Sequence, residues 1–475
     1  MSGRARRALK NFGYAAAVQV VALLLSLTLS LVVPKMLGVV AFGYWQLFVF
    51  YSSYVGFFHL GMCDGVYLRV GGVPFREMDY KELGAELRTM LLGLLIVSLV
   101  GSGCALLWVG DVNRRYVIVT TALVMIIMNV NTFMGSVFQA GNVVRWYSTS
   151  LLVNSGIFLA LISGAVLARL SDFRYIILMY GAAQICRLVY SLVKGRKILP
   201  FLKPNIFQVK TLTVVGRDVG IGLKLMLANI ADLLIVGTGR FFVDHAWGIA
   251  EFGQYSFAIS LSSLVIMFFS QVSMVLFPEL RQLSAESRKR VYRTIRDVLG
   301  VLLPAAYLLY LPTQVFVGHW LPNYEMSLTY FGLLLPICVF NGKMNLLYKT
   351  YMKVLRRERA LLTINVWVFL GNGILCAASV FWLHSVTLVI ISSVVAVTVR
   401  SVVTEIYLSR ILDSPVGLTL WAECVLSLVF VVSVWLCPAS IAFLIFATCY
   451  GVYLLASRGV LRGAVGSMSQ IIGRR

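Results

Sequence analysis

The chain has 475 residues, of which 60% are hydrophobic and only 13% are charged. Soluble domains carry about 25% charged residues, so this composition excludes a soluble globular protein. Repeated apolar runs of about 18 residues or more instead predict an all-α protein that crosses a membrane many times. The formal net charge of +22 would also suit a nucleic-acid-binding protein. The positions of the charges, described below, fit membrane topology and indicate no nucleic-acid partner.

The sequence contains no motif for a zinc protease, an ATPase phosphate-binding loop or a hydrolase nucleophile. The eight cysteines lie in or beside apolar runs and form no CxxC pair, which is typical of small buried side chains rather than metal ligands. We therefore expect no catalytic residue, no metal site and no cofactor, and a protein that is not an enzyme.

The N-terminus places four basic residues, Arg4, Arg6, Arg7 and Lys10, before a first apolar run over residues 13–33. A secretory signal peptide has a shorter apolar region and a cleavage site with small residues, so this run is predicted to be an uncleaved first span. Thirteen further apolar runs bring the expected number of spans to fourteen. They cover residues 41–62, 89–109, 116–138, 149–168, 175–193, 218–238, 253–277, 297–318, 327–346, 361–381, 386–408, 417–436 and 439–457.

The lysines and arginines indicate the orientation of these spans. With the N-terminus inside, most of the 41 basic residues fall on inner segments, including Arg281–Arg296 and Lys343–Arg359. Only six fall on outer segments: Lys35, Arg114, Arg115, Arg169, Arg174 and Arg240. The positive-inside rule then predicts a multi-pass protein with both termini in the cytoplasm. The basic inner loops are also expected to contact anionic membrane lipids.

A short repeat divides the chain. The sequence AFGYW at Ala41–Trp45 follows the first span, and EFGQY at Glu251–Tyr255 follows the seventh. Six spans separate the two motifs, so the repeats have the same orientation. We expect an N-terminal six-helix lobe over 1–200 and a C-terminal six-helix lobe over 201–412. Residues 413–475 then form an extra helix pair and a cytoplasmic tail.

The seventh span carries unusual charges. Lys224 and Asp232, with Asn229 between them, lie inside the apolar run of residues 217–240. A charge at membrane depth costs about 2.5–3.5 kcal/mol, so it requires a partner or a wet cavity. Eight residues place Lys224 and Asp232 roughly 80° apart around a helix and about 12 Å apart along its axis, too far to neutralise each other.

Several short motifs resemble those of a known family. They are Leu37–Gly38, FGYW at Phe42–Trp45 and HLGMCDGVYLRVGG at His59–Gly72. The chain resembles the bacterial polysaccharide or oligosaccharide flippases of the multidrug/oligosaccharidyl-lipid/polysaccharide exporter superfamily. The fourteen spans agree with that architecture. The resemblance is carried by motifs mainly over residues 11–72.

The resemblance implies a flippase of the bacterial inner membrane. Such proteins move an undecaprenyl-pyrophosphate-linked oligosaccharide from the inner to the outer leaflet by alternating access, for surface polysaccharide such as O-antigen, capsule or exopolysaccharide. It implies a V-shaped, often cationic cavity between two pseudo-symmetric lobes, coupling to a proton or cation, and cooperation with a polysaccharide polymerase. The alternative is a multidrug or cation antiporter of the same superfamily. A membrane glycosyltransferase requires a sizeable outer loop with catalytic carboxylates, and the outer loops are all short.

Because the first span has no charge, the cavity charge is expected from the sixth and seventh spans. Lys224 and Arg187 are predicted to bind the pyrophosphate, or else to snorkel to the membrane surface. Asp232 is predicted either to couple transport to an ion or to pair with a basic residue of the other lobe.

Polar uncharged residues complete the candidate site. Asn129, Asn131 and Asn229 are predicted to hydrogen-bond sugars, or else to join helices to one another. Arg400 and Glu405 close the twelfth span, where we expect them to pair with each other at the membrane surface.

Overall fold

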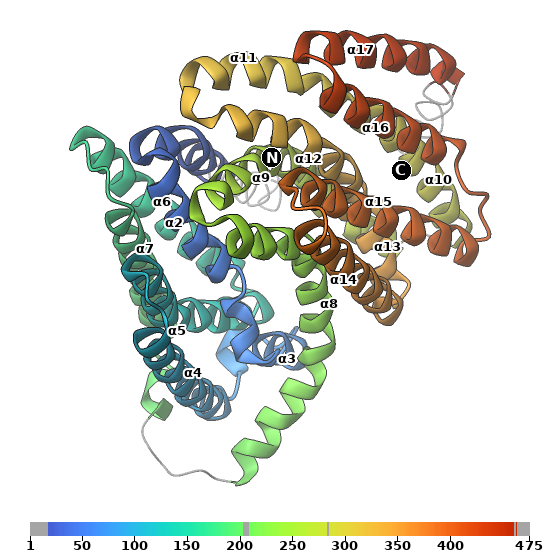
Figure 1. Ribbon diagram of the computed structural model, residues 1–475. Coiled ribbons are helices and arrows are strands. Elements are labelled where there is room, and N and C mark those ends of the chain that lie inside the picture. Colours follow the sequence, from blue (N-terminus) through green and yellow to red (C-terminus); the bar gives the residue numbers. More distant parts are fainter. Residues whose placement is uncertain (1–17, 203–208, 283–284, 460–461, 463–475) are drawn as a thin grey trace, which may run out of the picture. The chain divides into compact units, whose positions relative to one another are not determined.

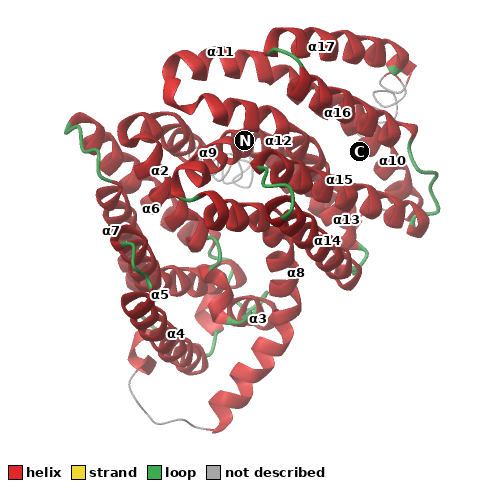
Figure 2. Ribbon diagram, viewed as in Figure 1, coloured by secondary structure: helices red, strands yellow, loops and turns green. Residues whose placement is uncertain are grey.

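The computed structural model describes residues 18–202, 209–282, 285–459 and 462, without the side chains of 209–212, 224–225, 268–282 and 285 (Figure 1). All regular structure in these ranges is helical, as Figure 2 shows. The expected all-α class is therefore confirmed. The chain forms two compact units, residues 1–230 and 231–475.

In the described part of unit 1, α5 packs against α4, α6 and α7. Its elements are η1 (Thr28–Val32), α2 (Val33–Ser52), η2 (Val55–His59), α3 (Met62–Arg69), η3 (Phe75–Glu77), α4 (Tyr80–Trp108), α5 (Val112–Ala140), α6 (Val144–Leu167), α7 (Phe173–Lys194) and η4 (Leu199–Leu202). The helix α8 (Val209–Trp247) begins in unit 1 and continues into unit 2.

Unit 2 continues from α8 with α9 (Ile249–Gln282), α10 (Ala285–Leu302), η5 (Leu303–Leu309), α11 (Tyr310–Trp320), η6 (Pro322–Tyr324), α12 (Glu325–Lys343), η7 (Met344–Tyr348), α13 (Lys349–Val354), α14 (Glu358–Phe381), α15 (Val386–Ile411), α16 (Leu418–Leu436) and α17 (Ala439–Ala456). The helix α12 is the centre of this unit, because it packs against α9, α15 and α16 and nearly all of its side chains are buried.

Thirteen helical stretches of the described residues are long and apolar enough to cross a membrane. The first, Val18–His59, has 42 residues. That length corresponds to about 63 Å, twice the thickness of a bilayer core. Gly38 has a non-helical backbone at φ 71° and ψ 174°, so this stretch consists of two helices of about twenty residues each. With this stretch counted as two spans, the described residues contain the fourteen spans that the sequence predicts.

The two copies of the sequence repeat begin alike. Gly38 lies three residues before the AFGYW motif, and Gly248 lies three residues before EFGQY. Both glycines have positive φ, 71° and 83°, which a residue with a side chain rarely adopts. Each motif thus opens a helix directly after a glycine that redirects the chain.

One expected loop is largely helical. The tenth span was predicted to end at residue 346, but the helical stretch that starts at Pro322 continues to Val354. Lys343 is fully buried, and Lys349 contacts α8. The apolar run ends near residue 346 because Lys349 and further basic residues follow it in the sequence. Carboxylates of other helices compensate the charges of Lys343 and Lys349.

Candidate functional site

Asp232 lies at the centre of a polar cluster inside unit 2. Its carboxylate accepts a hydrogen bond of 2.6 Å from Lys349 Nζ and another from the Arg400 guanidinium. Asn345 Oδ1 accepts from Lys349 Nζ at 2.8 Å, and Asn341 Oδ1 accepts from Arg400. These five residues, which we call the Asp232 cluster, come from α8, α12, η7, α13 and α15.

The Asp232 cluster is partly open and carries a positive excess. The side chains of Asp232 and Lys349 are each 24% exposed, whereas that of Arg400 is 2% exposed. One carboxylate faces two cations, so the formal charge of the cluster is +1. Arg400 Nε is buried and donates to no described residue. The cluster can therefore accept a further anionic or polar oxygen.

A second polar cluster is closed. Lys343 Nζ lies 3.0 Å from a Glu405 oxygen and 2.8 Å from a Glu423 oxygen, and all three side chains are fully buried. Tyr348 also donates to Glu405, and Arg296 Nε lies 3.8 Å from it. We call these residues the Lys343 cluster. Its burial favours a structural role, because no member of the Lys343–Glu405–Glu423 triad is accessible from outside.

The chain segment around η7 positions both clusters. The wider π-helical turn Met344–Tyr348 separates Lys343 at the end of α12 from Lys349 at the start of α13. Lys343 is thereby directed to α15 and α16, and Lys349 to α8. Single π-helical turns occur frequently at functional sites, where they re-aim side chains.

The expected pair between Arg400 and Glu405 is wrong. Arg400 binds Asp232, and Glu405 binds Lys343. Five residues rotate a helix by about 500°, which leaves the two side chains roughly 140° apart and directed to different neighbours. Asp232 does not pair with the other lobe as predicted, because its partners Lys349 and Arg400 lie within its own unit. Its predicted role in ion coupling stays a prediction.

Two of the predicted sugar-binding residues lie in the interior of unit 1. The Asn129 amide donates to Val55 O and Met125 O, each at 2.9 Å. The Asn131 amide donates to the backbone and side-chain oxygens of Gln184 at 3.0 and 3.1 Å. Both asparagines are 1% exposed. In this conformation their amide groups join α5 to η2 and to α7.

Arg187 lies on the half-buried side of α7. Its Nη2 atom and the Tyr147 ring flank Gly135 of α5, at 3.9 and 3.2 Å from the position of an added Cβ. Within the described residues no carboxylate pairs with Arg187, and its buried Nε has no hydrogen-bond acceptor. Arg187 is thus a cation at a helix interface with an unused donor.

Lys224 and Asn229 lie on α8. The Lys224 side chain falls outside the described part of the chain, so its predicted contact with pyrophosphate stays a prediction. Asn229 is exposed.

A third charged cluster, which the sequence did not reveal, fixes the start of α8 in unit 1. The Arg69 guanidinium lies 2.8 Å from Glu82, 2.5 Å from Glu86 and 3.0 Å from Asp218. Burial alone would lower the pKa of Arg69, but the three carboxylates hold it above its ordinary value. Arg69 therefore stays charged and joins α3 to α4 and α8.

One sequence signal for these clusters was present. Glu423 is an isolated carboxylate in the apolar run of the thirteenth span, and such a residue requires a buried partner. The partner itself comes from a contact 80 residues away. Within the described residues, no group of three or more His, Cys, Asp and Glu side chains is arranged to hold a metal ion.

No protein-family model and no curated protein matches the sequence. Solved structures do match the fold. A lipid II flippase MurJ in an inward closed conformation superposes with a TM-score of 0.66 at 12% identity, over 94% of this chain and 99% of that one. An inward-facing multidrug resistance MATE family transporter of the MOP superfamily superposes with a TM-score of 0.60 at 11% identity, over 83% of this chain and 94% of that one.

These likenesses cover nearly the full length of both neighbours, and they agree with the superfamily that the motifs between Leu37 and Gly72 resemble. Their low sequence identity limits the inference to the fold. The chain therefore has the fold of the multidrug and lipid-flipping transporters of the MOP superfamily.

Proposed function

We propose that this protein is a flippase of the bacterial inner membrane. Its cargo is an oligosaccharide linked to undecaprenyl pyrophosphate, which it carries from the inner to the outer leaflet by alternating access. The product supplies the biosynthesis of surface polysaccharide, so a polysaccharide polymerase is the expected consumer.

The charge of the Asp232 cluster carries this proposal. Lys349 and Arg400 outnumber the single carboxylate of Asp232, and the cluster is partly open. A net positive site favours an anionic cargo such as pyrophosphate or an acidic sugar, because Arg and Lys bind phosphate oxygens through charge-assisted hydrogen bonds. A cationic drug would meet electrostatic repulsion there. Arg187 of unit 1 is a further cation, and it also has an unused donor.

The alternative function is a multidrug or cation antiporter. A cation antiporter requires a carboxylate that a cation can reach. Asp232 is already bound by two basic side chains, and the Glu405 and Glu423 carboxylates are closed off around Lys343. An incoming cation would have to displace a lysine or an arginine, so this conformation favours the flippase. We assign the coupling of transport to a proton or cation at Asp232 to another conformation of the transport cycle.

Deletion of the gene in its own bacterium tests the proposal. The deletion should leave oligosaccharide repeats on the undecaprenyl carrier in the inner leaflet and abolish surface polysaccharide. Expression of the wild-type chain should restore both. Intact polysaccharide combined with new drug sensitivity would support the antiporter and contradict the flippase.

A further inference from the structure

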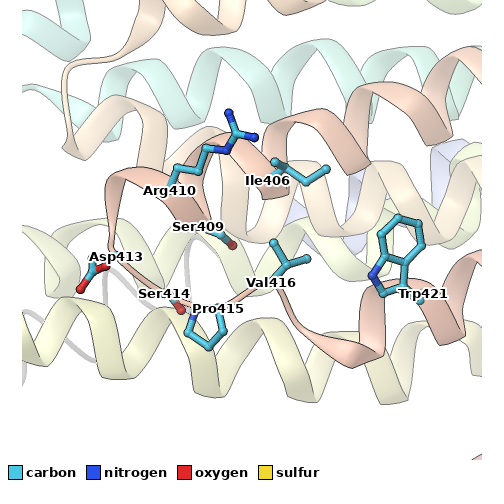
Figure 3. Close-up of a pocket in the computed structure, with 8 residues that line it drawn as sticks. All are labelled: Ile406, Ser409, Arg410, Asp413, Ser414, Pro415, Val416 and Trp421. Atoms are coloured by element: carbon cyan, nitrogen blue, oxygen red, sulfur yellow. The ribbon is translucent and has the colours of Figure 1, made fainter.

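A pocket of about 620 Å³ lies where α15 ends and α16 begins. Arg410, Ser409 and Ile406 line it from α15, and Trp421 lines it from α16 (Figure 3). The connecting residues Asp413, Ser414, Pro415 and Val416 complete the lining. Because α15 and α16 are both long and apolar enough to cross a membrane, the pocket lies at a membrane surface, which the charge distribution predicts to be the cytoplasmic one.

The connecting segment is held in place by three basic residues of α10. Lys289 Nζ donates to Asp413 at 3.0 Å, Arg293 Nε donates to Ser414 Oγ at 2.8 Å, and Arg296 Nη1 donates to Pro415 O at 2.7 Å. In addition, Ser414 N donates to Ser409 O at 2.8 Å. Four contacts on three consecutive residues make the wall of the pocket a preformed structure.

The pocket combines a cation with exposed apolar surface. Arg410 is exposed, and within the described residues no carboxylate pairs with it. The hydrogen bond from Lys289 holds the pKa of Asp413 below its ordinary value, so this carboxylate is ionised and already neutralised by the lysine. Trp421 is 57% exposed and Val416 is 37% exposed.

We propose that this pocket binds the headgroup of an anionic phospholipid of the cytoplasmic leaflet, with Arg410 on the phosphate and Trp421 and Val416 against the start of the acyl chains. Arginine forms paired hydrogen bonds with phosphate oxygens, and tryptophan favours the membrane interface. A soluble anion would leave the apolar half of the lining in water, whereas a lipid covers both halves. The pocket volume falls in the range of small-molecule sites, about 300–1,000 Å³. This inference is independent of the transport function.

Lipid binding to the purified full-length protein tests the proposal. Delipidated protein is titrated with phosphatidylglycerol or phosphatidylcholine, and retained lipid is read by native mass spectrometry. Arg410→Gln should weaken binding of phosphatidylglycerol about tenfold, as the loss of one charge-assisted bond implies. It should weaken phosphatidylcholine less, because the choline cation already offsets the charge of that lipid's phosphate. Arg410→Lys should retain part of the affinity. Trp421→Ala should weaken both lipids.

Arg359→Gln is the matched control, because Arg359 is also exposed and lies in the first turn of a long apolar helix, away from the pocket. This variant should bind phosphatidylglycerol like the wild type. Equal losses in Arg410→Gln and Arg359→Gln would overturn the proposal, as would equal binding of the two lipids by the wild type. Displacement of phosphatidylglycerol by inorganic phosphate would also overturn it, in favour of a soluble anion.

Discussion

At the scale of single residues, Asp232 compensates two cations of very different exposure. Asp232→Asn removes the charge but keeps the shape, and leaves Arg400 buried without a counter-ion. We expect Asp232→Asn to lower the free energy of unfolding by about 1.5–3 kcal/mol, which is the range for hydrogen bonds to charged groups. A second substitution, Arg400→Leu, should restore part of this loss, because it removes the uncompensated buried charge.

Lys349→Leu is the control for that second substitution. Lys349 is 24% exposed, so water can solvate its ammonium group when Asp232 is neutral, whereas Arg400 at 2% has no such access. Lys349→Leu should therefore restore less stability to Asp232→Asn than Arg400→Leu does. Thermal unfolding of the purified single and double variants measures the difference. Additive effects of Asp232→Asn and Arg400→Leu would show that the pair is not coupled.

Lys224 gives a second prediction at this scale, which rests on the proposed function. If it binds the pyrophosphate, Lys224→Ala should cut transport about tenfold or more, because a charge-assisted bond at a partly desolvated site is worth roughly 1.5–3 kcal/mol. Lys224→Arg should keep much of the activity. Surface polysaccharide and protein abundance are measured together for the Ala, Arg and Leu variants. Normal export by Lys224→Leu at normal abundance would remove Lys224 from the site.

At the scale of elements, α3 and the start of α8 meet backbone to backbone. A Cβ added to Gly222 would lie 1.9 Å from Gly61 O, and one added to Gly65 would lie 2.1 Å from Asp218 O. Neither contact can be relieved by rotating a side chain. Gly222→Ala should therefore separate the two helices and weaken the bonds of Arg69 to Asp218, at a cost of about 1–3 kcal/mol.

Gly220→Ala is the matched control on the same helix, because an added Cβ there has no atom within 4 Å. It should be neutral or stabilising by up to about 1 kcal/mol, since alanine favours a helix more than glycine does. The unfolding temperatures of the purified Gly222→Ala and Gly220→Ala variants measure this difference. Equal behaviour of Gly222→Ala and Gly220→Ala would contradict the close packing of α3 on α8.

The helices themselves were predictable from the sequence, because each span is a local property of about twenty consecutive apolar residues. The two-helix division of Val18–His59 was also predictable, since Pro34 and Gly38 interrupt the run. The charge clusters were not. Asp232 and Arg400 are 168 residues apart, and Lys343 and Glu423 are 80 apart. Hydrophobic periodicity carries no information on which distant helix supplies a counter-ion.

At the scale of the whole molecule, the fold is shared by a lipid II flippase and a multidrug transporter. The architecture therefore provides two units and a set of spans, while the side chains inside them select the cargo. This is why short motifs and the span count predicted the superfamily fold. The proposed cargo rests instead on the charge of a few residues, chiefly Lys349, Arg400 and Arg187.

The orientation of the chain in the membrane is also a property of the whole molecule. The asymmetry of lysine and arginine predicts that both termini and the 355–357 connection lie in the cytoplasm and that Asp244–Gly248 lies outside. Ala246 is exposed in the last turn of α8 and serves as the outer probe, whereas Ser287 in the first turn of α10 serves as the inner one.

On a background without native cysteines, a membrane-impermeant thiol reagent should label Ala246→Cys in intact cells. It should label Ser287→Cys only after the membrane is permeabilised. Labelling at that step also shows that the half-buried position of Ser287 does not itself prevent the reaction. The two probes lie on either side of α9, so they are on opposite sides of the membrane only if α9 crosses it once. The pair therefore tests the predicted span at α9 as well as the orientation of the whole chain. Labelling of Ser287→Cys but not of Ala246→Cys in intact cells would reverse the map, and with it the assignment of the lipid pocket to the cytoplasmic leaflet.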